Sequence, residues 1–523
     1  MLFTSDAFLF LFLPASLAGY YLLGRIGRGA AAVWLIVTSF VFYGWWNPAY
    51  VGLLAISVTF NYLCGLAILS RTARPKQQTA VLVVGIAVNL TALFYYKYFF
   101  PLLQELQAHG IGATTGIIAV VLPLGISFFT FTQIGYLVDC RQGVAKERGI
   151  TDYFLFVTFF PHLIAGPILH HAEIMPQFAN RETYRLRAEN LAVGLTIFVI
   201  GLAKKLLFAD PLAVPADIGF DHPETLQFLG AWSALLSYSL QLYFDFSGYS
   251  DMAIGVARMF GVRFPLNFNS PYRALCIIEF WQRWHMTLTR YITLYLYNPV
   301  VLVVTRRRVA NGYGITRRAT ATPGGFAGMI VLPTLFTMGI AGIWHGAGWQ
   351  FLIFGLLHGL YLTINHAWRV FGPRAAATPR PLPLTVTIAA VQALLTYLAV
   401  LVGQIFFRAS SAASALKILG AVAGLHGIDA TGADLPDPDI HVGHAQWLHA
   451  ARLAGLFAVI WLLPNTQQLL ANFSPTITKF NAGSQRVWRW QPTLGWAVAI
   501  VLLFFAALST RLGDPARFLY FQF

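Results

Sequence analysis

The sequence has few charged residues and few cysteines. Charged side chains make up 11% of the 523 residues, whereas a soluble domain carries about 25%. The three cysteines, Cys64, Cys140 and Cys276, are widely spaced and form no Cys-x-x-Cys pair. The sequence therefore predicts neither a zinc site nor a disulfide framework, and it excludes an ordinary soluble domain.

Several well-known motifs are also absent from the sequence. It contains no Gly-x-Ser-x-Gly elbow, no P-loop and no Gly-x-Gly-x-x-Gly segment. The usual sequence evidence for serine-triad hydrolysis, for ATP-driven transport and for a glycine-rich cofactor cradle is therefore lacking. There is no internal repeat and no soluble catalytic domain, and we expect no bound cofactor and no metal.

Long apolar runs are what the sequence has in abundance. Hydrophobic residues make up 57% of the chain, and runs such as Val81–Leu93 are continuous, without the alternation of an outer-membrane barrel. The sequence therefore predicts an all-α polytopic membrane protein. The expected spans are Ala7–Leu23, Ala31–Trp46, Val51–Leu69, Thr79–Phe99, Ile117–Val138, Leu191–Phe208, Leu226–Phe244, Phe326–Ile343, Phe351–Trp368, Leu384–Phe407, Leu453–Leu463 and Leu494–Leu508.

The distribution of charge predicts the topology. The net charge is +15, and the basic residues lie in short loops between apolar runs, which is the positive-inside pattern and not that of a nucleic-acid-binding protein. Asp6 precedes the first span and Arg25 follows it, which favours a retained helix over a cleaved signal peptide. With the amino terminus outside, the loops predicted to be cytoplasmic lie around positions 25–28, 71–76, 141–148, 306–308, 369–380 and 479–489. The loop around 181–187 is also cytoplasmic if Phe154–Ile168 dips into the membrane and returns.

One polar insertion is predicted to lie outside the cell, around residues 424–449. It contains four aspartates and no lysine or arginine between His426 and His449. Its four histidines make a metal site conceivable, but the Pro-Asp-Pro-Asp run is typical of an irregular loop, which is the interpretation we favour.

Two regions mix proline, glycine and charge with apolar residues, namely Phe154–Ile168 and Asp245–Val304. Broken backbone is tolerated at membrane depth only where it lines a cavity walled by protein. We interpret both regions as re-entrant elements around an internal site. The alternative is a set of ordinary amphipathic helices on the cytoplasmic side.

Two histidines in apolar surroundings are the candidate catalytic residues. His345 lies in Gly342–Trp349, between glycines and tryptophans that we expect to narrow the space around it, and His285 lies in Glu279–Leu288. An ionisable side chain at membrane depth is costly and marks a functional site by default. Burial keeps an imidazole neutral, so that it can act as a base. The alternative is a histidine that only bonds a helix carbonyl.

Acidic and basic side chains near these segments have two interpretations. Asp245 and Asp251 bracket Ser247–Ser250, and they could orient a histidine or bind Arg273 or Arg283. Structural ion pairs are the alternative. Lys204 and Lys205 are typical of anchors in a cytoplasmic loop.

Six segments carry a resemblance to a known family, and they occur in the same order as in that family. They are Phe159–Ile168, Tyr243–Ala253, Phe268–Arg273, Phe280–His285, Trp344–Trp349 and Phe518–Phe523. On these segments the sequence resembles the membrane-bound O-acyltransferases, and specifically the bacterial branch of alginate O-acetyltransferases and the teichoic-acid D-alanyl transfer protein. It departs from the family at His162, where glutamine is expected, and at Tyr297–Val301, where a basic segment is expected.

The resemblance implies one domain over residues 1–523, with about 11–13 transmembrane helices and re-entrant elements in a ring around a central tunnel. It implies that His345 is the catalytic histidine and His285 the second histidine of the active site. The basic side chains expected to contact the acyl donor are Arg306, Arg307 and Arg308. The residues expected to line the tunnel or contact substrate are Trp344, Trp349, Asp245, Asp251, Arg283, Trp284, Asn269 and Tyr272.

Three hypotheses for function follow. The first is an enzyme of the bacterial inner membrane that moves an acyl group, expected to be acetyl, from cytoplasmic acetyl-CoA or an acyl-carrier-protein thioester. The acceptor would be an extracytoplasmic polysaccharide such as alginate or cellulose, or a periplasmic partner acyltransferase. In it His345 would be the base and His285 would orient the acceptor or stabilise charge. The alternatives are a transporter with a histidine proton relay and a non-catalytic assembly scaffold.

Overall fold

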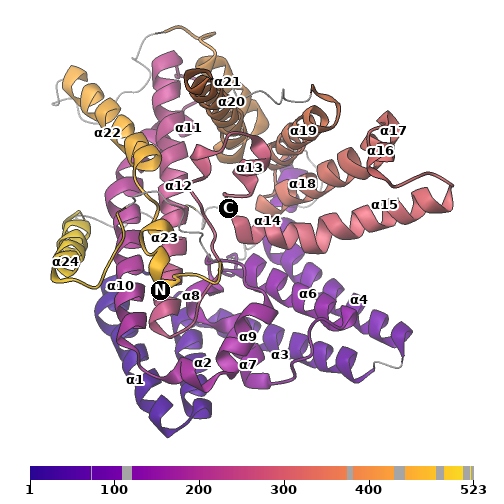
Figure 1. Ribbon diagram of the computed structural model, residues 1–523, viewed down its shortest axis with the longest axis vertical. Coiled ribbons are helices and arrows are strands. Elements are labelled where there is room, and N and C mark those ends of the chain that lie inside the picture. Colours follow the sequence, from indigo (N-terminus) through magenta and orange to yellow (C-terminus); the bar gives the residue numbers. More distant parts are fainter. Residues whose placement is uncertain are drawn as a thin grey trace. The chain divides into compact units, whose positions relative to one another are not determined.

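The computed structural model describes residues 1–71, 74–108, 121–373, 381–428, 442–478, 488–510 and 519. Within these residues every regular element is a helix, and there is no strand (Figure 1). Seven helices are long and apolar enough to cross a membrane, and four shorter apolar helices accompany them. The prediction of an all-α polytopic membrane protein is confirmed.

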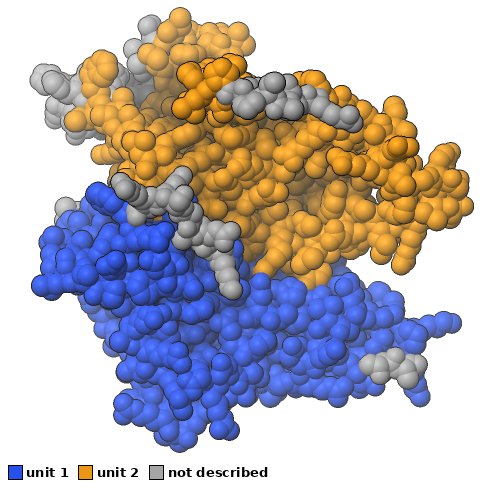
Figure 2. Space-filling view, viewed as in Figure 1, with its two compact units in different colours: residues 1–207, 246–266, 466–522 blue, residues 208–245, 267–465, 523 orange. Residues whose placement is uncertain are grey.

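The described chain forms two compact units, which Figure 2 distinguishes by colour. Unit 1 comprises residues 1–207, 246–266 and 466–522, and unit 2 comprises residues 208–245, 267–465 and 523. The single domain, the ring of helices and the tunnel that the resemblance implies stay predictions.

Unit 1 is built from the helices of the first two hundred residues together with two later segments. Its helices follow the predicted spans closely: the segment Ala7–Ile26 was expected at Ala7–Leu23, and α3 at Val51–Leu69. The helices of unit 1 are α1 (Leu13–Ile26), α2 (Arg28–Gly44), α3 (Ala49–Ser70), α4 (Pro75–Phe94), α5 (Phe100–Ala108), α6 (Ile126–Gln142), α7 (Ile150–Thr158), α8 (Phe160–Leu163), α9 (His171–Ala179), α10 (Ala188–Ala203), α23 (Thr466–Leu469) and α24 (Leu494–Ser509).

The span expected over Ile117–Val138 has a different start in the structure. Helix α6 begins at Ile126, directly after Gly125, whose φ of 72° is left-handed. A left-handed residue interrupts the helical backbone, and glycine adopts that conformation without strain. The expected helix is therefore wrong from Val121 to Gly125, and residues 117–120 lie outside the described residues.

The first of the two irregular regions is buried on all sides within unit 1. It forms the end of α7 and the short α8, and every residue from Leu155 to Leu169 is buried. An amphipathic surface helix would keep one face in solvent. The burial therefore favours the internal element that we predicted over the amphipathic alternative, and its depth in the membrane stays a prediction.

Helix α12 (Phe228–Met259) corrects the second irregular region. We expected helix to end at Phe244, but α12 continues through Asp245 and Asp251, with residues 228–245 in unit 2 and 246–259 in unit 1. Gly248 lets this part of α12 pack closely against α10 within unit 1, because a Cβ at that position would lie 2.8 Å from the carbonyl oxygen of Gly201 in α10. The polar residues do not interrupt the helix, because their side chains are buried and form polar contacts.

Unit 2 contains most of the residues proposed for the active site. The irregular stretch after α12 leads into short helices, so the expected broken segment is correct only beyond residue 259. The remaining helices of unit 2 are α11 (Ala213–Asp221), α13 (Ile277–Trp281), α14 (Met286–Ile292), α15 (Asn298–Ala310), α16 (Arg317–Thr320), α17 (Pro323–Phe326), α18 (Leu332–His345), α19 (Trp349–Phe371), α20 (Leu382–Arg408), α21 (Ala412–Val422) and α22 (Val442–Leu462).

Helices α18 and α19 lie side by side and meet at two glycines (Figure 1). A Cβ on Gly342 would lie 2.3 Å from the carbonyl oxygen of Phe351, and a Cβ on Gly355 would lie 2.2 Å from that of Met338. The two backbones are therefore in direct contact, and only glycine fits at the crossing. The crossing holds the last turn of α18, which carries His345.

Part of the polar insertion around residues 424–449 lies outside the described residues, namely 429–441. Of its described histidines, His449 is in α22, and its Nε2 lies 3.0 Å from the Ser237 hydroxyl of α12. The predicted extracytoplasmic position of the insertion stays a prediction.

Candidate active site

His345 is the last residue of α18 and is 8% exposed. Its imidazole packs edge-on against Trp344, with ring centroids 4.7 Å apart, and against Phe407 of α20 at 4.9 Å. Phe354 of α19 lies 5.8 Å from it. Aromatic rings from three helices of unit 2 thus surround the histidine, as expected for a base kept away from bulk water.

The environment of His345 differs from the prediction in one respect. Trp344 is buried, but Trp349 is 74% exposed at the start of α19. The expectation that both tryptophans narrow the space around His345 is wrong for Trp349, and Phe407 and Phe354 take that place. Gly346 is required for space, because a Cβ there would lie 2.2 Å from the ring of Phe351.

His285 is held in an unusual backbone conformation between α13 and α14. It is 2% exposed and has a φ of 41°, which is left-handed. Such a conformation costs about 1–3 kcal/mol for a non-glycine residue and persists only where the surroundings impose it. Here the N–H of Met286 donates to the carbonyl oxygen of Asn267 at 2.9 Å, and the N–H of Thr289 donates to that of His285 at 3.0 Å.

The side chain of Asn267 determines the tautomer of His285. Its Oδ1 lies 2.9 Å from the Nδ1 of His285 and also accepts the hydroxyl of Thr287 at 2.9 Å and the N–H of Thr287 at 3.4 Å. A backbone N–H only donates, so the Asn267 atom at this position is the oxygen. The Nδ1 of His285 must therefore carry the proton, and its Nε2 presents a lone pair.

Burial lowers the pKa of His285 to about 3, because desolvation disfavours the charged ring. The imidazole is therefore neutral at physiological pH. A neutral ring with its proton on Nδ1 accepts a hydrogen bond at Nε2 and does not donate one. Of the two roles considered for His285, orienting a hydroxyl fits this tautomer, and donating to a developing oxyanion does not.

A third buried histidine, His358 of α19, was not among the predicted site residues. It is 1% exposed, and its Nδ1 accepts the indole N–H of Trp281 at 3.3 Å. A Cβ on Gly403 of α20 would lie 2.5 Å from its Nε2, so the ring is tightly enclosed. The rule that singled out His345, an ionisable side chain in a spanning helix, applies equally to His358 and could have found it.

Aromatic contacts connect the three histidines within unit 2. Phe354 lies between His345 and His358, at 5.8 Å and 4.8 Å from the two rings. From His358 the contacts continue through Phe280, Trp284 and Phe268 to His285, with centroid separations of 6.3, 5.7, 5.1 and 6.4 Å. A series of ring contacts, which passes through the half-buried Trp284, therefore connects the two predicted catalytic histidines in one aromatic cluster of unit 2.

Tyr272 and Trp284 belong to the same cluster, and their expected contact with the tunnel or the substrate stays a prediction. Their rings stack 6.1 Å apart. The Tyr272 hydroxyl donates to the carbonyl oxygen of Ser239 at 2.8 Å and accepts from Gln404 at 3.0 Å. Tyr272 thus links α12 and α20 and stacks on Trp284, in the segment that carries His285.

The two predicted aspartates have different surroundings. Asp245 is buried in unit 2. Asp251 belongs to unit 1, where its carboxylate accepts from Lys204 at 2.6 Å, Thr466 at 2.6 Å and Gln467 at 3.0 Å. Asp251 therefore forms an ion pair within unit 1, which is the alternative interpretation given for it, and Lys204 is its partner. The interpretation of Lys204 as a positive-inside anchor stays a prediction.

The predicted arginine partners also bond elsewhere. Arg283 pairs with Glu279 at 2.6 Å, one helical turn away, and Arg273 donates to the carbonyl oxygens of Ile460 and Leu463. The hypothesis that either arginine binds Asp251 is wrong. Asn269 bonds the backbone of Arg283 through its N–H at 2.9 Å and the side chain of Asn465 at 2.9 Å.

The three arginines proposed for donor contact are not equivalent. Arg306 and Arg307 are exposed in the last turns of α15. Arg308 folds back, with its guanidinium 3.4 Å from the carbonyl oxygens of Gly314 and Gly324 and over the ring of Tyr313. Only Arg306 and Arg307 extend into solvent, where a phosphate could meet them.

Comparison with known proteins identifies the family of this chain. The sequence model of the membrane-bound O-acyltransferase family matches residues 139–312, a stretch that includes His285. The chain is 39% identical over 459 residues to a peptidoglycan O-acetyltransferase of Helicobacter pylori, covering 82% of this chain and 81% of that one. The chain belongs to the membrane-bound O-acyltransferase family.

Two further relatives show the breadth of the resemblance. This O-acyltransferase is 35% identical over 547 residues to a probable alginate O-acetylase AlgI of Azotobacter vinelandii, covering both chains completely. It is 26% identical over 324 residues to a teichoic acid D-alanyltransferase of Streptococcus thermophilus, covering 60% of this chain and 75% of that one. The predicted family and enzyme class are confirmed.

Proposed function

We propose that this O-acyltransferase transfers an acetyl group from a cytoplasmic thioester, acetyl-CoA or an acyl-carrier-protein thioester, to a hydroxyl outside the cell. The acceptor hydroxyl belongs to a polysaccharide such as alginate or cellulose, or to a periplasmic partner acyltransferase that passes the group on. The relatives are named for peptidoglycan, alginate and teichoic acid, and these polymers are extracytoplasmic. The protein would lie in the inner membrane of a bacterium.

In the proposed reaction, His345 carries one proton from the acceptor hydroxyl to the leaving thiolate. The hydroxyl oxygen of the acceptor attacks the carbonyl carbon of the thioester while His345 removes the hydroxyl proton. The tetrahedral intermediate collapses and the carbon–sulfur bond breaks. The leaving thiolate then takes from His345 the proton that came from the hydroxyl. The products are an ester and a free thiol, and no oxidant or metal takes part in these steps.

His285 would position the attacking hydroxyl. Because Nδ1 carries the proton that is donated to Asn267, Nε2 is the acceptor nitrogen of the ring, and it can accept a hydrogen bond from a hydroxyl and hold that hydroxyl in line for attack. The burial of both histidines in one aromatic cluster of unit 2 is the observation that carries the proposal. Such a cluster excludes water, which would otherwise hydrolyse the thioester.

The test replaces His345 with Ala in a strain that depends on this enzyme. Loss of a general base costs on the order of 10²–10⁴-fold in rate, so the acetyl content of the secreted polymer should fall to that of a deletion strain while the protein level in membranes is maintained. His222→Ala is the control, because the His222 side chain is 66% exposed. Normal acetylation by the His345→Ala variant would contradict the assignment of the base.

A further inference from the structure

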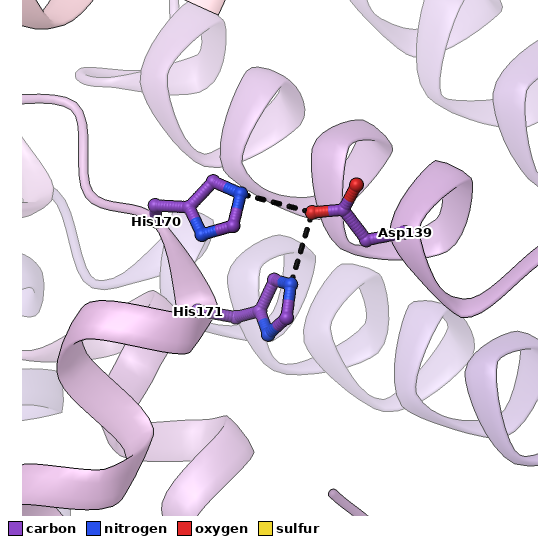
Figure 3. Close-up of side chains that lie close together, drawn as sticks. All are labelled: Asp139, His170 and His171. Carbon is purple, nitrogen blue, oxygen red and sulfur yellow. Dashed lines mark hydrogen bonds and ion pairs between the residues drawn. The ribbon is translucent and has the colours of Figure 1, made fainter. Parts of the chain in front are cut away.

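Unit 1 contains a second group of histidines, remote in sequence from those of the proposed active site. The Nε2 atoms of His170 and His171 lie 3.0 Å and 2.9 Å from the same carboxylate oxygen, Oδ2 of Asp139 (Figure 3). The side chains of Asp139 and His171 are only 6% and 1% exposed, and that of His170 is 20% exposed. The group is therefore nearly closed and opens to solvent beside His170.

The fold brings these three side chains together from two helices. Asp139 lies in the last turn of α6, which ends at Gln142 and is followed by Gly143 with a left-handed φ of 74°. After this turn the N–H groups of Val144 and Ala145 donate to the carbonyl oxygen of Asp139 at 2.9 Å and 3.1 Å. His170 and His171 open α9 and point back toward α6 (Figure 3).

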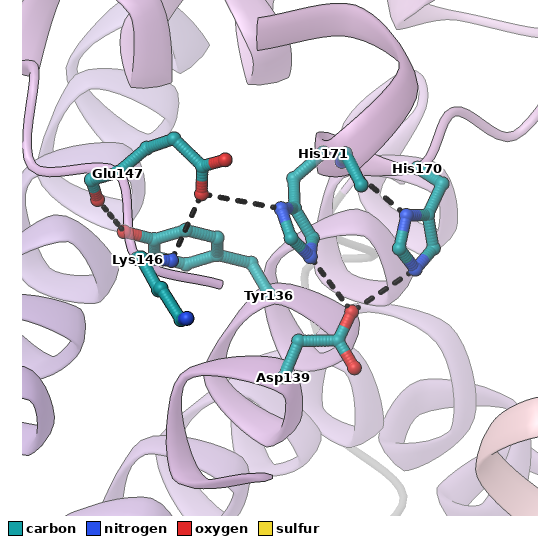
Figure 4. Close-up of polar contacts among 7 residues, drawn as sticks. Tyr136, Asp139, Lys146, Glu147, His170 and His171 are labelled. Atoms are coloured by element: carbon teal, nitrogen blue, oxygen red, sulfur yellow. Dashed lines mark hydrogen bonds and ion pairs between the residues drawn. The ribbon is translucent and has the colours of Figure 1, made fainter. Parts of the chain in front are cut away.

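A second carboxylate approaches the same histidine from the other side. Oε2 of Glu147 lies 3.6 Å from the Nδ1 of His171, and the N–H of Lys146 donates to it at 3.0 Å (Figure 4). The hydroxyl of Tyr136 donates to the carbonyl oxygen of Glu147 at 3.1 Å. Two carboxylates thus flank one buried imidazole, and with neutral rings the group carries two negative charges.

We propose that Asp139, His170 and His171 bind a divalent transition-metal ion, Zn²⁺ by ligand type, through Oδ2 and the two Nε2 atoms. These three ligand atoms lie within 4.8 Å of one another. A tetrahedral zinc ion about 2.0–2.2 Å from each ligand holds the ligand atoms roughly 3.3 Å apart, so shifts of a few tenths of an ångström suffice for the two nitrogen–oxygen pairs. The fourth position is left for water on the exposed side of His170.

Glu147 fits the role of the outer carboxylate in such a site. A histidine that binds a metal through Nε2 usually donates its Nδ1–H to a carboxylate, which fixes the ring and makes the ligand more basic. The 3.6 Å separation between Glu147 and His171 is too long for a hydrogen bond, but a small rotation of the Glu147 side chain would close it. Without a metal, the Nδ1 of His171 faces the Glu147 carboxylate in the same way, whether or not this nitrogen carries a proton.

Metal binding would replace protons in this group. Without a metal, the Nδ1 of His170 accepts the N–H of Ala172 at 3.3 Å, so its Nε2 carries the proton and donates it to Asp139. A metal at Nε2 moves that proton to Nδ1 or releases it, and the contact with Ala172 is given up. We therefore expect His170 to be the weaker ligand. The competing explanation is a metal-free group in which a protonated His171 bridges Asp139 and Glu147.

The metal would be a tie within unit 1, joining the end of α6 to the start of α9. Neither this group nor its helices include the histidines of the proposed active site, so the ion stabilises the fold and takes no part in acyl transfer. Neither the cysteine spacing nor the polar insertion points to these three side chains, so the sequence predicts no metal. Asp139 and His171 are 32 positions apart, and only the fold brings them together.

The experiment uses the full chain, purified in detergent, stripped with EDTA and titrated with Co²⁺, whose visible absorption reports ligand geometry, and then with Zn²⁺ in competition. We expect one equivalent of metal per chain and a rise in melting temperature with Zn²⁺ that EDTA reverses. Asp139→Asn and His171→Gln should bind metal at least about tenfold more weakly. His222→Gln, which changes an exposed histidine, should bind like the wild type.

His170→Gln decides the matter if the two buried variants do not fold, because its side chain is partly exposed and can still cap α9. It too should weaken Co²⁺ binding by about tenfold or more. The proposal is overturned if the wild-type protein takes up no metal and Zn²⁺ leaves its melting temperature unchanged, as a bridging protonated His171 would predict. It is also overturned if His170→Gln binds metal as tightly as the wild type, because the ion would then lie elsewhere.

Discussion

Asn267 accepts the Nδ1 proton of His285 through an amide oxygen 2.9 Å away. The N–H of Thr287 contacts the same oxygen and thereby identifies it. Asn267 is fully buried, and its backbone carbonyl also holds the residue after the histidine. This pair fixes both the position and the tautomer of His285, and it makes the first prediction specific.

Asn267→Leu should lower kcat with little change in the KM for either substrate. The change leaves a buried N–H of His285 without its acceptor, which costs about 1–3 kcal/mol and corresponds to roughly 5–150-fold in rate if the cost falls on the transition state. Steady-state acetyl transfer by purified enzyme, measured beside the amount of folded protein, checks it. A proportional rise in KM with constant kcat would count against a positioning role.

Asn267→Asp should shift the pH dependence of activity. Burial holds the pKa of His285 at about 3, so the ring is neutral and active across the neutral range. A carboxylate in place of the amide favours the protonated ring and raises this pKa, so activity should be lost at a higher pH as the solution is acidified. An acid limb identical to that of the wild type would show that His285 does not titrate in the activity profile.

Gly403→Ala should impair catalysis through His358. The added methyl would lie 2.5 Å from Nε2 of a ring that has no free space around it, and the ring contacts Phe354 beside His345. Overpacking of this kind costs typically 1–3 kcal/mol. Gly455→Ala is the matched control, because nothing lies within 4 Å of a Cβ at that position. Equal activity and equal melting temperature for the two variants would contradict the prediction.

Asp251→Asn should destabilise the protein without changing the chemistry. The Lys204 and Asp251 side chains are only 13% and 8% exposed, and removing one partner of a buried ion pair costs about 3–5 kcal/mol. The melting temperature should fall, while activity per folded molecule should stay near that of the wild type.

Glu182→Gln provides the comparison for Asp251→Asn, because it removes an exposed partner of Arg185 and Arg187, and exposed pairs contribute about 0–1 kcal/mol. A specific loss of activity in Asp251→Asn, at full stability, would support the predicted role of Asp251 in lining the tunnel or contacting substrate.

Arg306→Gln combined with Arg307→Gln should raise the KM for the thioester donor. The two side chains are exposed, and cationic side chains attract phosphate groups in a salt-dependent manner. Donor titrations at low and high salt measure the effect, and Lys417→Gln, which changes an exposed cation of α21, controls for net charge. If the KM is unchanged, the arginines serve only as a topology signal.

Much of the fold could be predicted, because spanning helices depend on local composition. Helix α20 was expected at Leu384–Phe407 and is found at Leu382–Arg408. The end of helix α12 was predicted wrongly, because its continuation depends on contacts between residues that are distant in sequence. Its acidic residues suggested a break, but Asp251 is paired with Lys204, 47 positions earlier in the chain, and no local pattern reveals such a partner.

Only those residues of the candidate site that stand out in the local sequence could be predicted. His285 and His345 could be found, because a single ionisable side chain in an apolar segment is visible in sequence. Asn267 could not, because its bond to His285 crosses 18 positions and depends on a left-handed turn at His285. Trp349 was misassigned because neighbours in sequence diverge where α18 ends and α19 begins, and Phe407 reaches His345 from another helix.

The contact between Gly342 and Gly355 separates the placement of His345 from the composition of its surroundings. Because α18 and α19 meet backbone to backbone, the histidine is anchored by main chain, while Phe354 and Phe407 only shape the space around it. Smaller or larger side chains at these two positions should therefore alter which acyl groups fit without displacing the base. Substitutions at these two positions could therefore change the acyl specificity during evolution while His345 keeps its position.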